Sequence, residues 1–236
     1  MRAEARHQLK QDRFAATTFE TFSWAVEHRK NLIMGGAAAA LVVALVLGGW
    51  TYLQNQEQLA STQLGQALRT FEAQIVAPGT PPQPGVTTFS SVKERAQAAQ
   101  PAFRTIAAKY GLTHSGELAR YFAALTDTDL GNTSAAEKEL KDIAGAHNKD
   151  LAALAKLALA SVYHNSNRDS DAIGLYKELI AHPTLSVGKA QAQLELAGLY
   201  AAKQPQEAKK LYEQIAKDNA TNPAGQLASS RLAELK

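Results

Sequence analysis

The hydrophobic positions of this chain form two patterns, one continuous and one periodic. The continuous pattern is residues 32–53, LIMGGAAAALVVALVLGGWTYL, and no charged residue lies between Lys30 and Glu57. At about 1.5 Å of rise per residue, a helix over this run is roughly 33 Å long, close to the thickness of the hydrocarbon core of a bilayer. The run therefore predicts one transmembrane helix over residues 32–53.

A cleaved signal peptide is the alternative interpretation of this run. Its apolar region would have about 7–15 residues, with a short basic start before it and a cleavage site between small residues after it. Here residues 1–31 precede the run, and the bulky Trp50 and Tyr52 lie at its end. These features favour an uncleaved anchor, with the aromatic side chains at the membrane interface.

The charges beside the run predict its orientation. Arg29 and Lys30 lie directly before it, whereas the first basic residue after it is Arg69. Positive charge resists translocation, so we expect residues 1–31 to stay in the cytoplasm and residues 54–236 to cross the membrane.

The periodic pattern occupies the second half of the chain, where a three-position motif recurs every 36 residues. In each copy a small residue is followed by a large one four positions later and an aliphatic one three positions after that, which places all three on one helix face. The copies are Ala136, Leu140 and Ile143; Ala172, Tyr176 and Leu179; and Ala208, Tyr212 and Ile215. A weaker copy, Ala99, Phe103 and Ile106, lies 37 residues before the first of these.

A second repeated segment predicts a partner for each of these helices. Leu159–Tyr163 (LASVY) matches Leu196–Tyr200 (LAGLY). Paired helices of this kind bury their apolar faces by stacking on the next pair, so we predict an all-α fold in which a transmembrane helix precedes a helical solenoid. The stretch 77–91 is rich in Pro and Gly and predicts a loop between two helices.

These repeats resemble the tetratricopeptide repeat, with the pattern L-[GA]-x2-Y, then Ala, an aromatic residue four later, and a closing Pro such as Pro183 or Pro223. The resemblance implies a tetratricopeptide-repeat-like domain over residues 54–236. Its units are 57–110 with the loop 77–91, then 115–147, 150–183 and 187–223, followed by a capping helix over 224–236. We expect Leu227, Leu232 and Leu235 on the buried side of that helix. The family tryptophan is absent, and Lys156 stands in its place in the best repeat.

The whole chain is similar to the bacterial ancillary subunit of the Sec translocon, which combines a basic-flanked N-terminal anchor with degenerate repeats of this type. That resemblance implies a single-pass protein of the inner membrane with its C-terminal domain in the periplasm. It implies protein partners, namely the translocon and a membrane-anchored periplasmic chaperone. A scaffold of the same fold for another envelope assembly, such as cell-wall synthesis or division, is the alternative.

Composition and charge exclude several kinds of chemistry and one class of ligand. The chain has no cysteine, which excludes thiol chemistry and disulfides, and residues 54–236 carry 19 basic and 18 acidic residues with no basic block that would bind nucleic acid. Gly111 and Gly116 have the spacing of a phosphate loop, but Glu117 follows where lysine is required, so we interpret the segment as a turn with Ser115 as the N-cap.

The remaining polar residues predict no enzyme, cofactor, metal or small-molecule substrate. The six histidines are scattered, and no pair has the i, i+4 spacing of a helical metal site. Asp169 and Asp171 are interpreted as a helix cap and a first-turn charge rather than as acid–base groups.

Two candidate binding surfaces remain. The concave face of the solenoid, matched position by position, consists of Leu118, Tyr121, Leu125, Leu154, Leu157, Ser161, Leu194 and Gly198. An apolar lining of this kind suits a segment of another protein, although these side chains can equally pack against the adjacent unit. Within the transmembrane run, a ladder of small residues could contact a partner helix, or it could simply reflect alanine richness. The ladder is Gly36, Ala40, Ala44 and Gly48.

Overall fold

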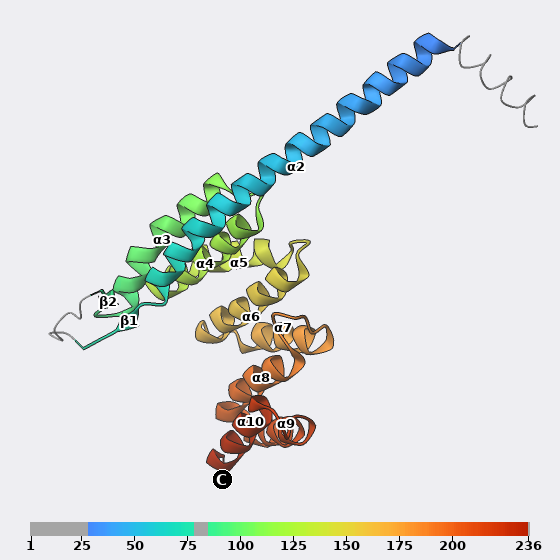
Figure 1. Ribbon diagram of the computed structural model, residues 1–236. Coiled ribbons are helices and arrows are strands. Elements are labelled where there is room, and N and C mark those ends of the chain that lie inside the picture. Colours follow the sequence, from blue (N-terminus) through green and yellow to red (C-terminus); the bar gives the residue numbers. More distant parts are fainter. Residues whose placement is uncertain (1–27, 78–84, 236) are drawn as a thin grey trace, which may run out of the picture. The chain divides into compact units, whose positions relative to one another are not determined.

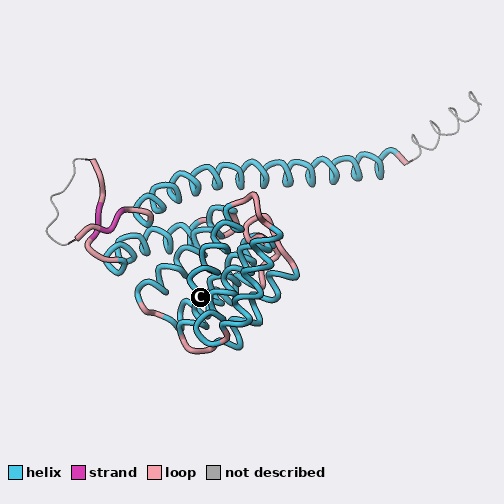
Figure 2. Tube along the Cα trace, turned by 90° about the horizontal axis from the view of Figure 1, so that it is seen from below, coloured by secondary structure: helices cyan, strands magenta, loops and turns pink. Residues whose placement is uncertain are grey.

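The computed structural model describes residues 28–77 and 85–235. The chain divides into two compact units, Met1–Asn55 and Gln56–Lys236, each considered by itself below. Most of the predicted cytoplasmic segment 1–31, much of the predicted loop 77–91 and the last residue of the predicted capping helix lie outside the described residues. Figure 2 shows that the described regular structure is helical apart from one short pair of strands.

The first described helix, α2, spans Arg29–Phe71. Of the described helices it alone is long and apolar enough to cross a membrane, and none of its apolar window is buried. Large apolar side chains such as Leu45 and Trp50 are more than half exposed. An apolar helical segment with nothing packed on it is typical of one that needs lipid or a partner around it.

The second unit begins with residues 56–71 of α2 and continues through eight further helices, which follow one another as stacked antiparallel neighbours (Figure 1). Their bounds are α3 Val92–Lys109, α4 His114–Leu130, α5 Thr133–Ala144, α6 Lys149–Asn165, α7 Asp169–Ala181, α8 Lys189–Lys203, α9 Pro205–Asp218 and α10 Pro223–Glu234. The all-α solenoid predicted from the sequence is confirmed.

The repeated triplets form the buried faces of the second helices. Ala136, Ala172 and Ala208 are completely buried, and the large and aliphatic residues that follow each of them are at most 4% exposed. The weaker copy on α3 behaves in the same way, although Pro101 lies inside that helix. Alanine at the first position lets two backbones approach closely, and the larger residues fill the space between neighbouring pairs.

Three hydrophobic clusters follow the stack. The first joins α2, α3 and α4 around Phe103, the second extends from α4 to α8, and the third lies between α8, α9 and α10 around Tyr212 and Ile215. Because clusters connect neighbouring pairs rather than one centre, each pair depends mainly on the next one for its stability.

The connection after α2 contains a feature that the sequence did not predict. Strand β1, Gln74–Ile75, pairs in parallel with β2, Thr88–Phe89. Two-residue strands of this kind close the ends of a long loop without adding a sheet to the core. Ser91 then caps α3 by accepting a hydrogen bond from the Glu94 N–H at 3.1 Å.

Three details of the helix ends correct the expectations. The N-cap of α4 is Thr113, whose hydroxyl accepts from the Gly116 N–H, so Ser115 is not the cap. Asp169 lies in the first turn of α7 after Arg168 and is not a cap either. On α10, Leu232 and Leu235 are half-buried as expected, but Leu227 is exposed.

Candidate protein-binding surface

The residues predicted for the concave face lie on three successive first helices, α4, α6 and α8. We call this set the first-helix face: Leu118, Tyr121, Leu125, Leu154, Leu157, Ser161, Leu194 and Gly198. In each helix they lie three or four positions apart, which places them on one side of it.

Exposure differs strongly along the first-helix face. Tyr121 is only 9% exposed and belongs to the core, where burial raises the pKa of its hydroxyl. The five leucines are half-buried and pack against the core clusters, whereas Ser161 and Gly198 are exposed. The leucines therefore support the neighbouring unit and still present part of their surface, so binding by this face stays a prediction.

A hollow of about 460 Å³ lies at the C-terminal end of this face. It is lined by Leu194, Glu195, Gly198, Ala201, Tyr212, Leu227, Arg231, Glu234 and Leu235. Its walls come from α8, α9 and α10, so the capping helix completes it. The absence of a side chain at Gly198 keeps the hollow open above the Tyr212 hydroxyl, which lies 3.9 Å from where a Cβ would stand.

The charged wall of the hollow was not predicted. Arg231 Nη1 donates to Glu234 Oε2 at 2.9 Å, and Glu195 lies on the facing helix α8. Together with Leu194 and Leu235 these groups offer an apolar floor with charges at the edge. Such a lining suits an amphipathic peptide segment better than a small polar metabolite. Among the described residues, no group of three or more His, Asp or Glu could hold a metal ion.

Polar contacts between helices hold the repeat units in place. Asp127, whose side chain is 7% exposed, accepts hydrogen bonds from Arg104 at 2.9 and 3.0 Å and from Gln100 at 2.8 Å, both on α3. Asn132, just before α5, donates to the same carboxylate at 3.0 Å. This carboxylate connects three consecutive helices.

The third and fourth pairs are joined by another carboxylate. Asp169 on α7 contacts Lys203 on α8 and, at 2.7 Å, His164 on α6. The hydrogen bond from Lys203 is the main reason why the pKa of Asp169 is lowered, followed by the one from His164. The pKa of Asp150, at the start of α6, is also lowered, chiefly by a hydrogen bond from the Ser186 N–H.

These lowered pKa values predict acid sensitivity of the repeat stack. A carboxylate with a lower pKa in the folded state stabilises the fold above its unfolded pKa, and this contribution is lost as the pH falls through the folded pKa. We expect the double variant Asp150→Asn, Asp169→Asn to have a lower Tm than the parent at pH 7. The difference in Tm should shrink as the pH falls below about 3.9, the usual pKa of an aspartate, and the two carboxylates become protonated.

Circular dichroism melts of the full chain in mild detergent, taken across this pH range, would measure the difference. Asp218→Asn, at the exposed end of α9, is the matched control and should give no such pH-dependent gap. A gap for the double variant that stays constant down to pH 3 would contradict the assignment.

The predicted packing face of the apolar segment is fully exposed. Gly36, Ala40, Ala44 and Gly48 all lie on α2, and a Cβ at Gly36 or Gly48 would meet no atom within 4 Å. A larger side chain would therefore fit there in the isolated chain. Contact with a partner helix stays a prediction.

Comparison with known proteins is consistent with this geometry. A model of the tetratricopeptide repeat-like domain matches residues 23–184, more than half of the chain. The chain belongs to this family. The matched range contains the buried triplets on α3, α5 and α7.

Two solved structures share the tetratricopeptide-like fold. Both are crystal structures of nearly identical TPR-like repeats of a putative kinesin light chain from Podosopora anserina, one of them carrying a single substitution. Each has a TM-score of 0.50 and is 18% identical to this chain in sequence. Each alignment covers 78% of this chain; it covers 84% of the substituted protein and 85% of the other one. At this identity the likeness concerns the fold alone. No curated protein matches the chain.

Proposed function

We propose that this protein is a membrane-anchored protein–protein interaction module of the bacterial inner membrane, with its N-terminus in the cytoplasm and its repeat domain in the periplasm. The observation that carries the proposal is the extent of the family match. It begins at residue 23, before the apolar segment, and continues through the repeats to residue 184. The anchor and the repeats are thus matched together, and the apolar side chains of the anchor have nothing packed on them.

The partner we propose is the Sec translocon, together with a membrane-anchored periplasmic chaperone, so that the repeats assist proteins as they emerge from the channel. Tetratricopeptide-like repeats serve protein partners, and the hollow at Gly198 offers an apolar floor with charged edges. An anchor would keep this surface near the exit site. The resulting high effective concentration would allow weak and varied contacts to be occupied.

Site-specific photocrosslinking in cells would test this proposal. We expect a photoreactive amino acid at Ser161 or Gly198, both exposed on the first-helix face, to crosslink to translocon components, the chaperone or emerging chains. The same group at Lys138 or Lys177, exposed on second helices, should crosslink far less. Crosslinks to cell-wall synthases or division proteins instead would favour the scaffold function and contradict the translocon role.

A substitution within the hollow tests by how much the hollow contributes to recovery of the partner. Gly198→Arg should fill the hollow without disturbing α8, because the nearest side-chain atom to a new Cβ is 3.9 Å away. We expect recovery of the partner in mild detergent to fall at least about tenfold, as an obstruction costing about 1.4 kcal/mol would give. Gly174→Arg, on the exposed side of α7 with no neighbour within 4 Å, is the matched control. Equal recovery with both variants would exclude the hollow as the binding site.

A further inference from the structure

We propose that one edge of the repeat stack rests on the surface of the bilayer that holds the anchor. We call it the connector edge, and it consists of the links 110–113, 145–148 and 182–188, which join each second helix to the next first helix. The ligand is a membrane surface that contains anionic lipid headgroups. This inference rests on the proposed function, because it requires the apolar helix to be inserted.

Two leucines on the connector edge are almost completely exposed. Leu112 is 91% exposed and Leu185 is 99% exposed, more than any other large apolar side chain that the structure describes. The short turns at the opposite edge, 131–132, 166–168 and 204, contain Gly, Asn, Ser, Arg and Gln instead. In the longer connection at that edge, Ile75 and Val86 are only 43% and 45% exposed. A single exposed leucine is ordinary, but two at the tips of links on one edge indicate a surface that meets an apolar or interfacial environment.

Each of these leucines is held outward by a fixed turn. Beside Leu112, the Thr113 N–H and hydroxyl both donate to the carbonyl of the buried Tyr110, at 2.9 and 2.7 Å. Beside Leu185, the Thr184 N–H donates to the carbonyl of the fully buried Val187 at 2.9 Å, and the Val187 N–H donates back to the Thr184 hydroxyl at 3.1 Å. Because these hydrogen-bonded turns are held by the buried Tyr110 and Val187, the exposure of the leucines is built into the fold.

Chain connectivity places the first of these links near the membrane. Glu57 is four residues beyond Leu53, the end of the predicted span, and four residues extend at most about 14 Å. The Glu57 carboxylate accepts hydrogen bonds from the Ser115 N–H at 3.2 Å and from the Ser115 hydroxyl at 2.6 Å, at the start of α4. Burial alone would raise the pKa of Glu57, yet these hydrogen bonds leave it below its usual value, so the contact stays charged at neutral pH. The link with Leu112 is thereby tied to the point where the chain leaves the bilayer.

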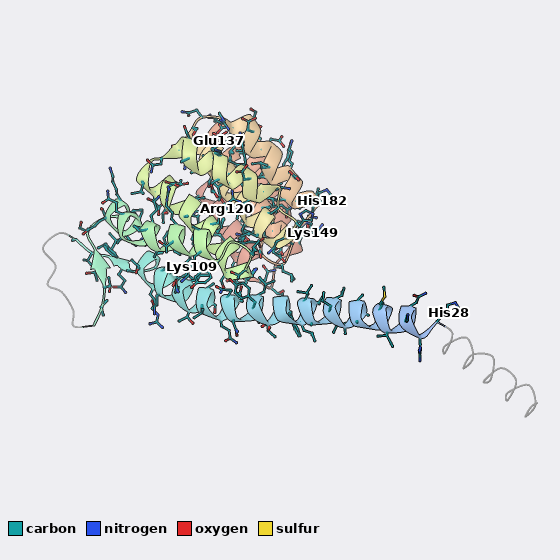
Figure 3. The ribbon with its side chains drawn as sticks, turned by 90° about the horizontal axis from the view of Figure 1, so that it is seen from above. His28, Lys109, Arg120, Glu137, Lys149 and His182 are labelled. Atoms are coloured by element: carbon teal, nitrogen blue, oxygen red, sulfur yellow. The ribbon has the colours of Figure 1, made fainter. Side chains whose placement is uncertain are left out.

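A hydrogen bond of the same kind connects link 182–188 to the start of α6, beside link 145–148. Asp150, in the first turn of α6, accepts a hydrogen bond from the Ser186 N–H at 3.0 Å, next to Leu185. As with Glu57 and Ser115, an acid at the start of one first helix binds a serine near the start of the next. Figure 3 shows Lys149 and His182 beside each other at this side of the stack, where both line the same hollow.

The exposed lysines of the connector edge can meet anionic headgroups, and the two carboxylates beside the links, Glu57 and Asp150, already accept hydrogen bonds from Ser115 and Ser186. Each of the three links has one exposed lysine and one exposed histidine in it or directly beside it. They are Lys109 and His114, His147 and Lys149, and His182 and Lys189. A lysine near an anionic membrane surface strengthens binding roughly fivefold, and leucines at the interface add an apolar contribution.

Fluorescence quenching in vesicles would test the inference on the full chain. The sequence has no cysteine, so single cysteines can be introduced at Leu112, Leu185 and, as the opposite-edge control, Ile75. Each would be labelled with an NBD fluorophore and reconstituted in vesicles of phosphatidylethanolamine and phosphatidylglycerol that contain spin-labelled quencher lipids. We expect strong quenching at positions 112 and 185 and weak quenching at 75. Equal quenching at all three positions, or none at 112 and 185, would overturn the inference.

Two further measurements show whether a negative result concerns the connector edge or the insertion of the apolar helix. The double variant Lys149→Gln, Lys189→Gln should weaken quenching at position 185 several-fold, and so should vesicles of phosphatidylcholine alone. The control double variant Lys138→Gln, Lys177→Gln should leave this quenching unchanged. A label at Val43, inside the predicted span, reports insertion of the anchor. Quenching at 43 without quenching at 112 and 185 would reject the connector edge and leave the anchor intact. Absence of quenching at 43 would reject both the anchor and the inference.

Discussion

Replacing Gly116 by alanine is expected to destabilise the repeat domain by about 3 kcal/mol, near the upper end of the usual cost of overpacking. A Cβ on Gly116 would lie 1.9 Å from the Tyr110 carbonyl oxygen and 2.4 Å from its carbonyl carbon. Both are backbone atoms at the C-cap of α3, and Tyr110 is itself buried, so neither can move aside by a change of rotamer. Gly225 on α10 has the same relation to the Asn219 carbonyl oxygen, at 2.0 Å.

Gly174→Ala provides the matched comparison. Gly174 lies inside α7, is exposed, and would have no atom within 4 Å of a new Cβ. Alanine there should stabilise the protein by about 0.5–1 kcal/mol, because glycine is a poor helix former. Urea unfolding of both variants in mild detergent, followed by circular dichroism, would measure the two effects. If Gly116→Ala were neutral or stabilising like Gly174→Ala, the close backbone approach at the start of α4 would be wrong.

Gly116 also shows where sequence reasoning succeeds and where it stops. Residues 111–113 form the predicted turn, and Gly116 lies in the first turn of α4. The physical reason for the second glycine is the approach of α3 to α4, which no local pattern reveals. The same holds for the cap: Thr113 and Ser115 are both good N-cap residues, and Glu57, 58 positions from Ser115 in the chain, binds the latter.

The fold was predictable because each repeat has a small, a large and an aliphatic residue at the same three positions. Ala172, Tyr176 and Leu179 recur at one period, and only a stack of paired helices buries such triplets repeatedly. The candidate site was less predictable. A helix face can be derived from spacing, but the exposure of Gly198 and the burial of Tyr121 depend on neighbouring units. The charged wall from Arg231 exists only because α10 packs where it does.

Replacing Phe103 by alanine is the second large effect that we expect, at about 4 kcal/mol. Phe103 is completely buried, and its ring stacks on Phe122 of α4 at 5.3 Å and meets Phe71, the last residue of α2, edge-on at 5.9 Å. Alanine would leave a cavity and remove both aromatic contacts. Because a repeat array is stabilised by neighbouring interfaces, most of this loss should fall on the pair formed by residues 56–71 and α3.

Hydrogen–deuterium exchange of the full chain would separate this local loss from general unfolding. In Phe103→Ala we expect faster exchange in residues 60–71 and 92–109, with exchange in α8 and α9 close to that of the parent protein. Phe103→Leu, which refills part of the cavity, should restore much of the protection, while Leu227→Ala at an exposed position of α10 should change little. Equal loss of protection in the first pair and in α8 and α9 would mean that the array unfolds as one unit. In that case the pair formed by residues 56–71 and α3 could not loosen without dismantling the surface at Gly198. Selective loss would mean instead that this first pair can open while the hollow keeps its shape.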